Sequence, residues 1–86
     1  MKIDAYNFTI YDVENVQADL MVEFANNDTL DVDMESVEKI DMAALQLLVS
    51  AKRSCQEERK TFGLSNVSDE VATAIRMSGL ESELGV

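Results

Sequence analysis

Histidine and proline are absent from this 86-residue chain, and Cys55 is its only cysteine. The missing histidine removes the commonest general base and the commonest transition-metal ligand, so any chemistry would depend on carboxylates, lysines, tyrosines and one thiol. A single cysteine can form neither an intramolecular disulfide nor a thiolate metal cluster within one chain. We therefore expect no enzyme activity, no cofactor and no metal ion.

Basic residues are scarce, because 7 lysines and arginines face 17 acidic residues and leave a net charge of -10. Such a surface repels nucleic acid and anionic lipid, so the expected partner is a protein with a basic or neutral face. The longest uncharged stretch, from Met42 to Ala51, is about half as long as a membrane span requires, and the N-terminus lacks a signal-peptide pattern. We expect a cytoplasmic protein that does not insert into a membrane.

The length fits one domain, residues 1–86, and the spacing of apolar residues predicts strands that alternate with helices. The expected strands are a short one within Lys2–Phe8, then Thr29–Met34 and Thr61–Ser65. The expected helices begin at three N-caps, Asp12, Asp41 and Ser68, and the first is about a dozen residues long and stops at Asn26-Asn27. Residues 35–40 are expected to form a loop or a continued edge. This order predicts an α/β fold with about three or four mostly parallel strands covered by about three or four helices.

One face of each expected element is apolar and should form the core. The expected core positions are Ile3 and Phe8, then Val13, Val16, Leu20 and Phe24, then Leu30, Val32 and Met34, then Ala44, Leu45, Leu48, Ala51 and Cys55, and finally Val71, Ala74 and Ile75.

The segment from Leu30 to Leu48 resembles the central part of STAS domains (sulfate transporter and anti-sigma factor antagonist), in which a strand and a loop lead to an aspartate at the start of a helix. Here that aspartate is Asp41. Leu64–Val71 and Met77–Leu80 agree with later parts of the family pattern, so the resemblance extends from about Leu30 to Leu80. Ile40–Leu48, together with Thr9–Tyr11, is similar to short stand-alone STAS proteins of chemotaxis and signalling operons.

The resemblance implies a non-catalytic module that docks onto another protein. The partner would be an anti-sigma factor or serine kinase-like regulator with a histidine-kinase-like ATP-binding fold, a chemotaxis component, or the ATPase of a lipid transporter. The implied binding surface is the loop and the first turns of the second helix, which contain Ser36, Glu38, Asp41, Met42, Ala43, Ala44 and Leu45. Oligomeric state stays open.

Two positions depart from the STAS pattern. Switchable members carry a phosphorylatable serine or threonine after the aspartate, where this chain has Met42, and methionine has no hydroxyl to accept phosphate. The family glycine is replaced by Ala44, which favours the helix by about 0.8 to 1 kcal/mol and adds a methyl group where a partner backbone would approach. The site is expected to be locked in its unmodified form.

Some of these residues have a second interpretation. Asp41 can serve only as an N-cap, Met42 can pack at the helix start, and Ser36 can be an ordinary loop serine. Asp31 and Asp33, with Asp28 and Asp12 nearby, could form a magnesium site or a phosphoacceptor pocket, although a solvated strand face is favoured. Cys55 is expected to be buried and inert, since no histidine can activate it.

Overall fold

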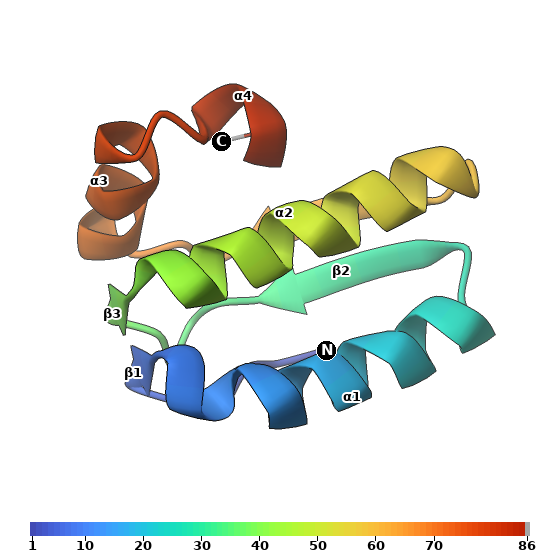
Figure 1. Cartoon of the computed structure of the whole chain (residues 1–86), viewed down its shortest axis with the longest axis horizontal. Helices are drawn as coiled ribbons and strands as arrows, with labels where there is room; N and C mark the ends of the chain where they lie inside the picture. The colour runs from blue at the N-terminus through green and yellow to red at the C-terminus, as the bar shows by residue number, and fades with distance from the viewer. Residues whose placement is uncertain (86) are drawn as a thin grey trace.

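The computed structural model describes residues 1–85. Its elements follow in the order β1 (Asn7–Phe8), α1 (Ile10–Asn26), β2 (Thr29–Asp33), β3 (Lys39–Ile40), α2 (Met42–Glu57), β4 (Thr61–Ser65), α3 (Asp69–Met77) and α4 (Glu81–Leu84) (Figure 1). This alternation of strands and helices confirms the predicted α/β class.

The strands pair in parallel, as the sequence predicts. β2 and β4 are aligned from Thr29 opposite Thr61 to Asp33 opposite Ser65, and the two-residue strands β1 and β3 form a second parallel pair. The N-terminal segment joins the edge of β2, because the backbone N–H of Ile3 donates to the carbonyl of Asp33 at 3.1 Å. In chain order, the N-terminal segment therefore pairs first with β2 and then continues into β1, which pairs with β3.

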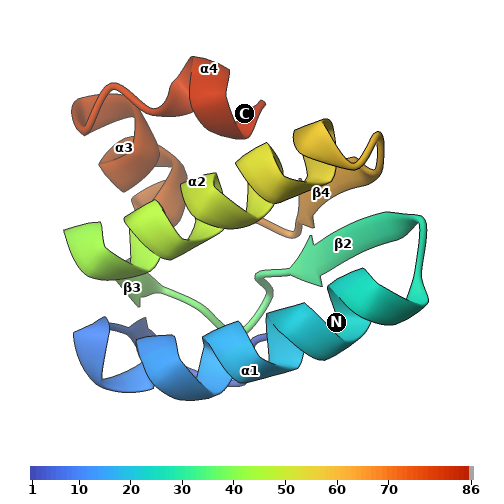
Figure 2. The same ribbon diagram turned by 45° about the vertical axis from the view of Figure 1, so that its right-hand side comes forward.

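Helices α1 and α2 lie side by side and run in the same direction, as both ribbon views show (Figures 1 and 2). Their N-termini lie together at the end of the molecule that holds β1 and β3. Their C-termini lie at the opposite end, near the start of β2. Helix α4 packs against α2 on the side away from α1. This arrangement brings two helix N-termini to one place on the surface.

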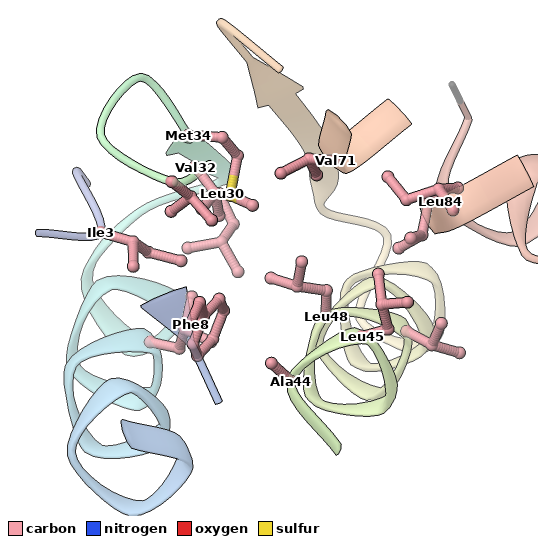
Figure 3. Close-up of a cluster of buried hydrophobic side chains, with 14 of the residues drawn as sticks. Ile3, Phe8, Leu30, Val32, Met34, Ala44, Leu45, Leu48, Val71 and Leu84 are labelled. Atoms are coloured by element: carbon pink, nitrogen blue, oxygen red, sulfur yellow. The ribbon is translucent and has the colours of Figure 1, made fainter. Parts of the chain in front are cut away.

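The core lies between the strands and the helices. Leu30 and Val32 are buried on one face of β2, whereas the intervening Asp31 is exposed, as expected of a strand with period two. Figure 3 shows Phe8 and Leu30 opposite Ala44 and Leu48 of α2. The fully or nearly fully buried side chains are Ile3, Phe8, Leu20, Leu30, Val32, Met34, Val37, Ala44, Leu45, Leu48, Val49, Cys55, Val71, Ile75 and Leu84.

The structure corrects the predicted boundary of the first helix. Helix α1 has 17 residues and its N-cap is Thr9, not Asp12. The Thr9 hydroxyl oxygen accepts the N–H of Tyr11 at 3.3 Å, and the Asp12 carboxylate accepts the N–H of Thr9 at 3.0 Å. Asp12 therefore occupies the third helical position of a capping box. The helix begins earlier than it would if Asp12 were the N-cap.

Two further elements were not predicted. Strand β3 forms within the expected loop because the Tyr6 carbonyl accepts the N–H groups of both Glu38 and Lys39, at 2.9 and 3.0 Å. Helix α4 has four residues, too few to show a helical period. Burial of Leu84 and an ion pair of 3.2 Å between Arg53 and Glu83 hold α4 on α2.

Candidate protein-docking face

Asp41 links the N-termini of α1 and α2. One oxygen of its carboxylate accepts the N–H of Ala44 at 2.9 Å, and the other accepts the N–H of Ile10 at 2.9 Å. The first turn of a helix leaves N–H groups without a partner in the helix, and the positive end of the helix dipole attracts an anion. One carboxylate therefore stabilises two helix starts. The predicted N-cap of α2 is confirmed, and its bond to α1 is an additional role.

Large apolar side chains are exposed around this carboxylate. Ile10 is 61% exposed, Tyr11 is 92% exposed and Met42 is 51% exposed. Met42 follows Asp41 in the chain, and Ile10 is hydrogen-bonded to Asp41, so the two helix starts lie side by side. We call Ile10, Tyr11, Asp41 and Met42 the docking face. Apolar side chains that gather on a surface around a charged group are typical of protein contact sites.

The remaining predicted site residues are either partly buried or fully buried. Ser36 and Glu38 are partly buried and lie before β3, where the N–H of Glu38 donates to Tyr6, so β3 separates them from Met42. Ala43 is partly buried in the first turn of α2. Ala44 and Leu45 are buried in the core, which corrects the expectation that they would contact a partner directly.

The acidic residues considered for a metal site do not come together. Asp12 is engaged with Thr9 at the start of α1, whereas Asp33 accepts hydrogen bonds from Asn66 at 3.1 Å and from the N–H of Glu35 at 2.9 Å. These two hydrogen bonds lower the pKa of the Asp33 carboxyl, the one from Asn66 most. Within residues 1–85 no group of three or more His, Cys, Asp or Glu side chains is arranged to hold a metal ion.

The Cys55 thiol is fully buried on the core side of α2. Burial raises the pKa of the Cys55 thiol, because the thiolate loses its hydration, and the charge of Lys60 opposes this only in part. A thiol that stays protonated is a poor nucleophile. This agrees with the predicted inert role.

Comparison with known proteins identifies the family. The family model described as "Mlab, STAS domain" matches residues 7–85. The chain belongs to the STAS domain family. STAS domains are in general non-catalytic modules of regulation and protein interaction.

A solved structure described as a sulfate transporter family protein from Wolinella succinogenes has the same fold, with a TM-score of 0.83. It is 24% identical to this chain, and the match covers 99% of this chain and 69% of that one. No curated protein sequence matches the chain. Within residues 1–85 no helix is both long enough and apolar enough to cross a membrane.

The sequence predicted Asp41 and Met42 in the docking face but not the contribution of α1. Thr9 and Asp12 have the three-residue spacing of a capping box, and that spacing would have placed Ile10 and Tyr11 in the first turn of α1. The bond between Asp41 and Ile10 joins residues 31 positions apart, and no local pattern reveals such a contact.

Proposed function

We propose that this STAS domain is a regulatory module that binds another protein through the docking face. The observation that carries the proposal is the position of Met42. In switchable STAS domains the corresponding residue is a phosphorylatable serine or threonine. Here it is a half-exposed thioether beside the carboxylate that caps α2 and accepts the N–H of Ile10 at the start of α1. A flexible thioether adapts its shape to an apolar surface, so Met42 suits a contact with a partner.

Binding at this face is not switched by phosphorylation of residue 42. A phosphate there would place about two negative charges beside Asp41, whereas methionine leaves the face uncharged apart from that one carboxylate. The module is therefore constitutively ready to bind, and any control of the complex comes from the partner or from the amount of this protein.

The partner is a protein with a basic or neutral contact surface, because the chain carries a net charge of -10. Three partner classes agree with the STAS assignment. These are an anti-sigma factor or serine kinase-like regulator, a chemotaxis component, and the ATPase of a transporter. All three classes agree with a cytoplasmic location. Identification of the captured protein distinguishes them.

Affinity capture from native lysate tests the proposal. The unaltered chain is compared with Met42→Asp and with Met77→Asp, which places the same change on an exposed methionine of α3. We expect one partner to be retained by the unaltered chain and by Met77→Asp and to be lost with Met42→Asp. Equal capture by all three baits would show that the docking face is not the binding surface.

The absence of a switch at residue 42 has its own test. After incubation with ATP and a serine kinase that modifies STAS domains, mass spectrometry should find no phosphate on this chain. The double variant Met42→Ser, Ala44→Gly restores the switchable pattern and serves as the positive comparison. Stoichiometric phosphate on Ser36 of the unaltered chain would contradict the proposal of constitutive binding.

A further inference from the structure

A groove between α1 and α2 lies apart from the docking face. It has a volume of about 430 Å³, and its apolar lining includes Leu20, Met21, Phe24, Leu30, Leu47 and Ala51. We call these six residues the interhelical groove. None of Ile10, Tyr11, Asp41 or Met42 lines it. The groove is therefore a second surface, separate from the one proposed above.

The lining of the groove suits the apolar face of a partner helix. Its sides carry the small residues Ala25, Ser50 and Ser54, which let another backbone approach closely. The apolar surface continues outward on α1, where Met21 is 64% exposed and Val22 is 61% exposed. Exposed apolar residues next to an apolar groove between two helices match the way proteins bind an amphipathic helix.

Helix α1, which forms one side of the groove, is an acidic helix, although none of its carboxylates lines the groove. Helix α1 contains Asp12, Glu14, Asp19 and Glu23 and no lysine or arginine. The basic residues of α2 are directed toward the other side, since Arg53 pairs with Glu83 of α4 and the Lys52 ammonium lies near Gly85. The ammonium of Lys60 lies over the Phe24 ring and bonds to the carbonyls of Phe24 and Asn27. The acidic charge of α1 is therefore left without a basic counterpart on the same helix.

We propose that the interhelical groove binds an amphipathic helix of a partner protein, with apolar side chains in the groove and lysine or arginine residues beside α1. Charge favours a basic partner helix over a second copy of this chain as the occupant of the groove. A second copy of this chain would bring its own acidic α1 and its net charge of -10, so two copies repel each other. A basic partner helix gains from the same field.

The test uses designed peptides as probes and does not depend on the docking face. One peptide is a basic amphipathic helix with leucines at positions i, i+3, i+4 and i+7 and lysines on both flanks, and the second replaces each lysine with glutamate. Ala25→Arg places a long cationic side chain in the groove lining, and residue 25 lies in the last turn of α1, where a cation is favourable. Ala18→Arg adds the same charge to α1 outside the groove lining and is the matched control.

We expect titration calorimetry to show that the basic peptide binds at micromolar concentration, that Ala25→Arg weakens binding about tenfold or more, and that Ala18→Arg and Met42→Asp have much smaller effects. The acidic peptide should not bind. The proposal is overturned if the basic peptide fails to bind at about 1 mM, if Ala25→Arg binds it as well as Ala18→Arg does, or if the acidic peptide binds equally. Sedimentation that shows a dimer lost in Ala25→Arg would assign the groove to a second copy instead.

Discussion

Each end of helix α1 is hydrogen-bonded by a charged side chain from a distant part of the chain, and the two side chains have opposite charges. At the N-terminus, the Asp41 carboxylate accepts the N–H of Ile10, a residue 31 positions away. At the C-terminus, the Lys60 ammonium bonds to the carbonyls of Phe24 and Asn27, 36 and 33 positions away. Each charge has the sign that the helix dipole favours at that end. Both contacts tie α1 to a distant part of the chain.

The two ends differ in what they leave exposed. Around Asp41 the side chains of Ile10, Tyr11 and Met42 are open to solvent. At the other end, the ammonium of Lys60 covers the Phe24 ring, 4.4 Å from its centre. The Asp41 contact therefore lies beside exposed apolar side chains, whereas the Lys60 ammonium covers one face of an aromatic ring. We therefore expect the Asp41 contact to lie within the proposed docking face and the Lys60 contact itself to act on stability.

The largest expected effect comes from the hydrophobic core. Leu48→Ala removes a fully buried side chain of α2 and leaves a cavity, so it should lower the free energy of unfolding by about 2 to 5 kcal/mol. Urea denaturation measures this loss. An effect below about 0.5 kcal/mol would show that Leu48 is not part of the packed core.

Met42→Asp separates binding from stability at the Asp41 end. A second carboxylate beside Asp41 should weaken partner binding by about 2 kcal/mol, because it charges an apolar contact. The fold should stay intact, since acidic residues are favourable in the first turn of a helix. Thermal melting checks stability and titration against the captured partner checks affinity. Met42→Leu keeps the apolar contact and should bind almost as the unaltered chain does.

Lys60→Met should lower stability and leave the affinity for the partner unchanged. The apolar stem of the side chain remains against Phe24, but the two carbonyls and the ring lose the ammonium. We expect the free energy of unfolding to fall by about 1 to 2 kcal/mol. Affinity for the partner should not change. A loss of affinity without a loss of stability would contradict the assignment of this end to stability.

The smallest expected effect is a pH dependence at the Lys60 end. Burial raises the pKa of the Cys55 thiol above its value in the unfolded chain, so the folded state retains its proton at higher pH. Above the ordinary thiol pKa the unfolded state binds fewer protons than the folded state, and stability should fall as the pH rises. Denaturation between neutral and alkaline pH should show this slope, and Cys55→Ala should reduce it.

Much of the fold follows from local sequence patterns. Helix α2 was predicted because Asp41 precedes a long run of residues with helical spacing, and β2 was predicted from the alternation around Leu30 and Val32. The start of α1 was misplaced because Thr9 and Asp12 are both good N-caps, and the structure uses them together. Strand β3 and helix α4 are too short for a periodic signal.

The candidate site could be predicted only in part. Asp41 and Met42 were found through the resemblance to STAS domains. The contributions of Ile10 and Tyr11, and the role of Lys60, depend on contacts across more than thirty positions. Helical spacing predicted Ala44 and Leu45 as core positions, whereas the STAS resemblance implied that they contact a partner, and the structure buries both in the core.

The most direct test of the account compares the affinity of Met42→Asp with that of Lys60→Met for the captured partner, at a temperature at which both variants are folded. The account predicts that Met42→Asp binds about 30-fold more weakly than the unaltered chain and that Lys60→Met binds equally well. Unchanged affinity of Met42→Asp would contradict it, and would move the contact away from the Asp41 end, toward the acidic surface of α1 around Glu14 and Asp19.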